Sequence, residues 1–152
     1  MRILLALVFV ALLPPPKEWQ SVIDATTTAI RKKDAAALEK LLMSFAEVNA
    51  TCGLTSPAEK QAEELDKNRA KRVAGAIEDC NIMDWKKAKF VSASGGEPDP
   101  KFSKCEKYKP AKSIDLVYDE GELRWTISLE PVVLSGKHLL RMQPRCLSSV
   151  KK

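Results

Sequence analysis

The four cysteines are the residues with the clearest chemistry in this sequence. Cys52, Cys80, Cys105 and Cys146 form an even set, and an even count in an exported chain favours two disulfides. A metal site is the alternative, but the sequence has no C-x-x-C motif and only one histidine, His138. We therefore predict a domain held by two disulfides, with no metal, and three pairings remain open at this point.

Acid–base chemistry has few candidates. An isomerase-type site needs a carboxylate base and hydrogen-bond donors inside an apolar pocket. Asp115 and Asp119 lie near Tyr118, but strand alternation puts both aspartates on the opposite face from Tyr118, which favours solvent exposure. His138 could act as a base or a ligand, yet it shares a strand face with apolar residues, which favours simple packing. We expect no catalytic residue and no cofactor, and keep enzyme activity as the alternative.

Aromatic side chains could line a pocket for a small apolar ligand. The candidates are Trp19, Phe45, Phe90, Tyr118 and Trp125. Aromatic residues at helix and strand periodicity also commonly form plain core, because they bury a large apolar surface. The sequence leaves both interpretations open.

A basic segment covers residues 86–112. It holds eight lysines against three acidic residues, a net charge of +5. Such a segment could contact anionic lipid, a cell-wall polymer or an acidic partner, and the candidate contacts are Lys101, Lys104, Lys107 and Lys109. A solvated loop kept soluble by lysine is the alternative. Scattered lysines on an exported chain fit nucleic acid binding poorly.

The N-terminus indicates how the chain is targeted. Arg2 precedes an unbroken apolar run over residues 3–13, and three prolines occupy positions 14–16. This pattern is typical of a secretory signal peptide, and the run is shorter than the roughly 20 residues that cross a bilayer. A buried N-terminal helix or strand is the alternative, but the prolines would detach it from the rest of the domain. We predict a signal peptide over 1–16, a single domain over 17–146, a tail over 147–152, and a secreted or periplasmic location.

Three helices are expected in the first half of the domain. Apolar residues recur at helical spacing over residues 17–32 and 35–49, with Asp34 as an N-cap between them. Ser56, Pro57 and Glu59 then combine an N-cap, a proline at the first helical position and a capping-box glutamate, which starts a helix over 57–80.

Four strands are expected in the second half. Residues 89–92, 114–118, 123–130 and 138–144 alternate apolar and polar side chains, or are rich in strand formers, between turn signals. Pro131 marks a bulge or bend. Helices followed by strands indicate an α+β fold, with the helices packed on one face of a curved, four-stranded antiparallel sheet.

Helix length and strand order choose between the cysteine pairings. A continuous helix over 57–80 spans about 36 Å, while the lead from Cys52 reaches at most about 18 Å. Bonded cysteines need Cα atoms within about 7 Å, so Cys52–Cys80 is excluded unless the helix breaks, for instance at Gly75. Alternating strands place Cys80 and Cys146 at one end of the sheet, and Cys52 and Cys105 at the other. We therefore predict Cys52–Cys105 and Cys80–Cys146.

Two segments resemble the NTF2-like, or cystatin-like, α+β families. Residues 29–38 (AIRKKDAAAL) resemble the helix, break and aspartate–alanine helix that open many of these domains, and residues 123–127 (LRWTI) resemble their late strands. The resemblance implies a cone, in which a curved sheet wraps a helix. The mouth of such a cone binds a small apolar ligand, hosts an isomerase or dehydratase site, or is filled by side chains.

The function expected from these patterns is an exported, non-enzymatic binding or interaction module. It would use the concave sheet face for a small apolar ligand or a partner protein. A cone-fold enzyme acting on a small organic substrate is the second hypothesis, and an anionic-surface binder using the lysine-rich segment 86–112 is the third.

Overall fold

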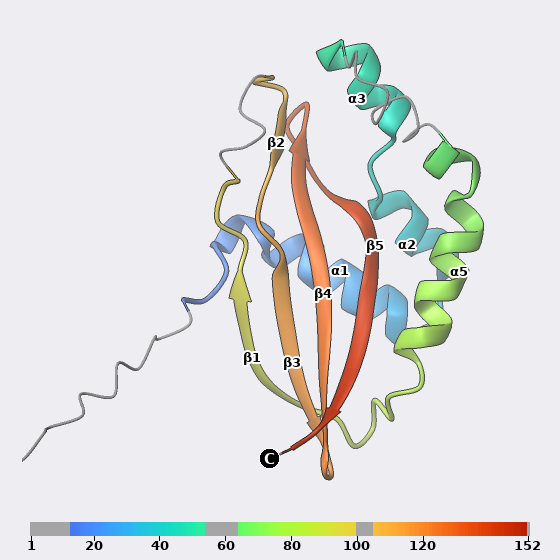
Figure 1. Cartoon of the computed structure of the whole chain (residues 1–152), viewed down its shortest axis with the longest axis vertical. Helices are drawn as coiled ribbons and strands as arrows, with labels where there is room; N and C mark the ends of the chain where they lie inside the picture. Colours follow the sequence, from blue (N-terminus) through green and yellow to red (C-terminus); the bar gives the residue numbers. More distant parts are fainter. Residues whose placement is uncertain (1–12, 54–63, 100–104, 152) are drawn as a thin grey trace, which may run out of the picture.

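A computed structural model of the chain describes residues 13–53, 64–99 and 105–151 (Figure 1). Most of the predicted signal peptide lies outside this range. Helices come first and strands come second, as predicted, so the fold is α+β. The elements are η1 (Lys17–Trp19), α1 (Gln20–Arg31), α2 (Ala35–Leu41), α3 (Phe45–Cys52), α5 (Arg69–Cys80), β1 (Lys89–Gly95), β2 (Tyr108–Pro110), β3 (Ile114–Glu120), β4 (Leu123–Leu134) and β5 (Lys137–Val150).

The sheet is open and antiparallel, in the order β1-β3-β4-β5. A fifth strand, β2, was not predicted. It pairs with residues 132–134 of β4. The other edge of β4 is paired with β5 at these residues. β2 therefore lies on the same side of β4 as β3, beyond the end of β3 (Figure 1). The predicted second strand corresponds to β3, whereas β2 lies in a segment that was predicted as a loop. The register of β4 against β5 shifts at Pro131, where a bulge was expected.

The last strand is longer than expected. β5 continues past Pro144 to Val150, and residues 147–150 pair with residues 123–126 of β4. The prediction of a tail starting at residue 147 is therefore wrong for 147–150. All four residues are exposed, with two serines between Leu147 and Val150, so the apolar alternation that reveals a strand is absent, although the backbone pairing is present.

The predicted second helix is divided into α2 and α3. Asp34 caps α2 as expected, because its carboxylate accepts from the backbone N–H of Ala37 at 2.9 Å. Leu42 then leaves the helix and bridges to Leu140 of β5, while the Met43 N–H donates to the Leu140 carbonyl at 2.8 Å. This contact with a distant strand breaks the helix, so the local pattern could not predict it.

The third predicted helix is also interrupted. Residues 64–67 are helical, Asn68 is irregular, and α5 begins at Arg69. Gly75, where the sequence allowed a break, lies inside α5. The start signal at residues 56–59 falls outside the described residues.

The two faces of the sheet have opposite character. One face carries the alternating apolar residues of β3 and β4, all at most 5% exposed and packed in one cluster with α1: Ile114, Leu116, Tyr118, Trp125, Ile127 and Leu129. In Figure 1, α1 crosses behind the sheet on this side, and α2 and α5 lie beside β5. We call this the covered face. The opposite, open face carries the alternate residues of the same strands, including Asp115, Asp119, Arg124, Thr126 and Ser128.

Candidate binding groove

Both disulfides are present in the predicted pairing. Cys52 at the end of α3 is bonded to Cys105 just before β2, with Cα atoms 5.7 Å apart. Cys80 at the end of α5 is bonded to Cys146 of β5, with Cα atoms 5.2 Å apart. The two bridges span 53 and 66 residues, so each fastens the helical half of the chain to the sheet half.

The acid–base candidates are not gathered into an apolar pocket. Asp115 and Asp119 lie on the open face, as the alternation predicted. Asp115 accepts a hydrogen bond from the Ser128 hydroxyl. Asp119 accepts from Arg124 at 2.9 Å and pairs with Lys151 at 3.0 Å, and these contacts, the one with Arg124 first, lower its pKa to about 2. Ionised and paired, it is a charged surface group.

Tyr118 and His138 are both packed against neighbouring side chains. Tyr118 is buried on the covered face, and burial raises the pKa of its phenol. The imidazole Nε2 of His138 lies 3.6 Å from the carboxylate of Glu18, and the Trp19 ring meets the imidazole edge-on at 5.2 Å. In the described residues, no cluster of three or more histidine, cysteine, aspartate or glutamate side chains is arranged to hold a metal ion.

Three of the five candidate pocket aromatics form a row across the sheet. Phe90, Tyr118 and Trp125 are register partners on β1, β3 and β4. Tyr118 and Trp125 are buried in the core, whereas Phe90 at the sheet edge is 60% exposed. Trp19 is buried beside α1, and its indole N–H donates to the Gly96 carbonyl at 2.9 Å. Phe45 packs in a second cluster elsewhere.

The structure describes two of the four lysines predicted to contact an anionic surface. Lys107 and Lys109 are exposed, one in the turn before β2 and the other in β2. Lys101 and Lys104 lie outside the described residues. The contact with an anionic surface stays a prediction.

A groove lies between α5 and β5. It is a hollow of about 380 Å³ lined from both elements, and its lining residues are Arg72, Gly75, Ala76, Asp79, Gln143, Pro144, Arg145, Cys146 and Leu147. None of the five candidate aromatics contributes to it. Gly75 opens its helical wall, since a Cβ added there would meet no atom within 4 Å.

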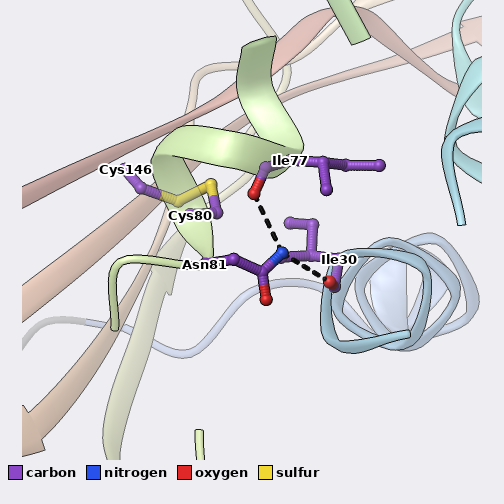
Figure 2. The surroundings of a disulfide bond; sticks show 5 residues. All are labelled: Ile30, Ile77, Cys80, Asn81 and Cys146. Carbon is purple, nitrogen blue, oxygen red and sulfur yellow. Dashed lines mark hydrogen bonds between the residues drawn. A yellow bond between two sulfur atoms is a disulfide. The ribbon is translucent and has the colours of Figure 1, made fainter. Parts of the chain in front are cut away.

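The C-terminal end of α5, the helix that forms one wall of the groove, is fixed by two consecutive residues (Figure 2). Cys80 bonds α5 covalently to β5. Asn81, the next residue, donates its side-chain amide to the carbonyl of Ile30 at 3.0 Å and to that of Ile77 at 2.9 Å. The end of α5 is therefore tied to the sheet on one side and to α1 on the other.

The upper end is fixed by arginines. Arg72 donates to the Gln143 side chain of β5, with its Nε 3.0 Å from the amide oxygen, and to the Leu65 carbonyl at 3.0 Å. Partial burial and the neighbouring Arg69 lower the pKa of Arg72. Arg69 itself donates to the carbonyls of Leu42 and Met43, where α2 ends. With both ends held, the groove walls are preorganised, which reduces the entropy lost on binding.

The charges of the groove are uneven. Arg72 hydrogen-bonds to uncharged acceptors, and Arg145 is 65% exposed with its guanidinium 3.7 Å from Glu130. Asp79 is the only acidic residue among the lining side chains. Both arginines nevertheless have a carboxylate nearby: Glu130 for Arg145, and Asp66 for Arg72, whose pKa that carboxylate acts to raise against the larger effects of burial and Arg69.

A second hollow, of about 370 Å³, lies on the other side of α5. It is lined by Lys33, Ala74, Ile77, Glu78, Asn81 and Ile82. Its lining residues come from α5, the two residues after it and the turn after α1, and none comes from a strand, so it offers no backbone hydrogen-bonding edge. Its similar size and its place on the same helix make it a matched control surface for the groove.

Comparison with models of protein families, with curated proteins and with solved structures finds no match to this chain. The described helices include none that is both long enough and apolar enough to cross a membrane.

Sequence reasoning missed the groove. Arg72 and Gln143 are 71 positions apart in the chain, and only the fold brings their walls together. One signal was available: a glycine inside a helical pattern often has a packing or functional reason. Gly75 was interpreted as a possible break in the helix, whereas in the structure it opens the helix surface.

Proposed function

We propose that this chain is an exported, non-enzymatic interaction module that binds a partner polypeptide in the groove between α5 and β5. The observation that carries this proposal is the contrast between the covered face and the groove. On the covered face, the apolar side chains of β3 and β4 are packed in one cluster with those of α1. The groove is open, lined by both elements and fixed at both ends.

This proposal changes the binding surface that the sequence suggested. The concave face was expected to hold the ligand or partner, but the six alternating residues of β3 and β4 on the covered face are buried against α1. We therefore assign partner binding to the groove. The relationship to the NTF2-like families stays a prediction, with which an α+β order and an antiparallel sheet are compatible.

Export is supported by the disulfides and by the N-terminal pattern. Both bridges close long loops, and such bonds persist in oxidising compartments outside the cytosol. The apolar run over 3–13 provides the targeting signal. We propose a secreted or periplasmic location on these grounds.

Site-specific photo-crosslinking in the native host tests the proposal. A benzophenone amino acid replaces Asp79, which lines the groove, or Glu78, which lines the second hollow as the matched control. We expect a protein adduct from position 79 that is weak at position 78, and that disappears when Gly75→Trp fills the groove. Equal adducts from both positions would contradict groove binding.

Native mass spectrometry distinguishes binding of a partner polypeptide from binding of a small ligand. The chain is purified from its host in oxidised form and analysed without denaturation. We expect the mass of the processed, disulfide-bonded chain alone. A bound small organic molecule that survives Gly75→Trp would instead favour a ligand site in the interior.

A further inference from the structure

Asn49, Ala50 and Thr51 form the pattern Asn-x-Thr near the end of α3. This pattern, with any residue except proline in the middle, is the acceptor for N-linked glycosylation in a eukaryotic secretory pathway. The chain has three asparagines, and Asn49 is the only one followed two positions later by serine or threonine. The two disulfides indicate folding in an oxidising compartment, and the lumen where this glycan is attached is such a compartment.

We infer that Asn49 carries an N-linked oligosaccharide. This inference rests on the export in the proposed function, and of the two proposed locations it selects secretion through a eukaryotic pathway. In the transfer, the side-chain Nδ2 of Asn49 forms a bond to the anomeric carbon of an oligosaccharide, and the bond from that carbon to a lipid-linked diphosphate breaks. The diphosphate leaves with the bonding electron pair, and Nδ2 loses one proton, so the step needs no oxidant or reductant.

The folded domain leaves space for a glycan on α3. The inner side of this helix is held by Val48, which is 2% exposed and packs in the smaller of the two hydrophobic clusters. Ala46, Glu47 and Ala50 are exposed on the outer side, and Asn49 is half-buried at the border. A glycosylated asparagine keeps one amide N–H and its carbonyl oxygen, so the side chain remains both a donor and an acceptor.

The position of α3 separates this acceptor from the groove. In Figure 1, α3 lies at the end of the molecule opposite the C-terminus. Neither Asn49 nor Thr51 is among the residues that line the groove or the second hollow. A glycan at Asn49 therefore modifies a surface that is distinct from the groove walls.

The helix itself shows when the transfer must occur. Residues two positions apart in an α-helix do not face each other, so in folded α3 the side chains of Asn49 and Thr51 point to different sides. One enzyme site cannot bind both of them in this conformation. The acceptor must therefore be modified before α3 forms.

The groups that stabilise α3 come later in the chain than the acceptor. The helix has 8 residues, and isolated helices of this length are unstable in water. The Asp66 carboxylate accepts from the N–H groups of Phe45 and Ala46 at 3.1 and 3.0 Å, and Cys105 fastens the end of α3 through Cys52. Because Asp66 and Cys105 are synthesised after residues 49–51, the acceptor is still unfolded when it enters the lumen.

Peptide mapping of the chain secreted by its native host tests the inference. The purified chain is reduced, digested and treated with a peptide-N-glycosidase in ¹⁸O-labelled water, which converts a glycosylated asparagine into labelled aspartate. We expect the label at position 49 in most of the secreted chain. Asn68 and Asn81 are internal controls outside any acceptor pattern and should stay unlabelled. An unlabelled Asn49 would overturn the inference.

Three variants identify the acceptor independently. Asn49→Gln and Thr51→Ala should each abolish the gel shift that separates the secreted chain from its glycosidase-treated form. Thr51→Ser keeps the acceptor pattern and should retain the shift. Glycan mass that remains in both Asn49→Gln and Thr51→Ala would place the modification elsewhere and overturn the assignment. Mapping of the wild-type chain decides the matter even where a variant is not secreted.

Failure of this inference is distinguishable from failure of the proposed function. An unlabelled Asn49 with a crosslinked adduct at position 79 would overturn glycosylation and leave groove binding standing, whereas a labelled Asn49 without that adduct would do the reverse. In native mass spectrometry the glycan belongs to the processed chain. It is removed by the glycosidase and survives denaturation, unlike a bound small molecule.

Discussion

The covered face and the open face of the sheet are built from the same strands but have different roles. Residues 125, 127 and 129 of β4 are buried against α1, while the intervening positions 124, 126 and 128 carry arginine, threonine and serine. The covered face supplies the stability of the domain, because its apolar area is removed from water. The open face is polar and joined by charge pairs, so substitutions there should have little effect on folding. The groove lies where the covered side ends, at the edge of β5.

The largest effect should come from loss of the bridge between the helices and the covered side. Cys146 is the register partner of Ile127, and Cys80 is fully buried. The double variant Cys80→Ala/Cys146→Ala frees a loop of 66 residues, which costs about 4 kcal/mol in the chain-entropy model. Urea unfolding measured by circular dichroism gives the free energy of unfolding.

The same experiment on Cys52→Ala/Cys105→Ala provides a comparison. That bridge closes a similar span of 53 residues, so the entropic cost should be similar. The Cys80→Ala/Cys146→Ala variant should also lose the crosslinked adduct from position 79, because α5 is no longer bonded to β5. An unchanged adduct at position 79 after loss of Cys80–Cys146 would show that the groove does not need its covalent end.

A core truncation compares the two faces directly. Ile127→Ala removes a fully buried side chain from the covered face and should cost about 3 kcal/mol, as large-to-small core substitutions do. Thr126→Ala changes the adjacent residue on the open face and should stay within about 0.5 kcal/mol. Both values come from urea unfolding. Equal costs at positions 126 and 127 would remove the distinction between the faces.

Much of this contrast could be predicted from the sequence, because alternation is a local property. The alternating residues of 114–118 and 123–130 indicated the two faces, and Asp34 indicated a helix start. The disulfide pairing was inferred from helix length and strand order. The local sequence pattern did not predict elements whose ends are set by contacts with distant residues. Leu42 leaves its helix to pair with Leu140, and β2 forms by pairing with β4. The groove could not be predicted, since α5 and β5 meet only after folding.

A smaller effect should come from loss of the Asn81 side chain. Its amide holds the end of α5 to the Ile30 carbonyl at the end of α1 (Figure 2). Asn81→Ala removes two hydrogen bonds from a half-buried site and should cost about 1 kcal/mol. Ile82→Ala, at the next and largely exposed position, is the control and should cost less. Unfolding midpoints in urea check both, and a larger loss at Ile82 would contradict the role given to Asn81.

The smallest effect on the free energy of unfolding should come from Asp119 on the open face, and it should depend on pH. Arg124 and Lys151 hold the pKa of Asp119 at about 2, below its usual value of 3.8. Because the folded-state pKa is lowered, the stabilising contribution of Asp119 is fully present above about pH 4 and is lost as the pH falls through about 2. The free energy of unfolding of Asp119→Asn should therefore lie below that of the wild type at pH 5.

The two curves should approach each other as the pH falls from about 4 to about 2, and the difference should shrink in high salt, because the pair is at the surface. Arg124→Gln in the same series is the matched variant. If Asp119 acts through Arg124, the double variant should lose little more than either single variant. A difference that stays constant over this pH range would show that the Asp119 side chain acts through packing, which would make this part of the open face resemble the covered one.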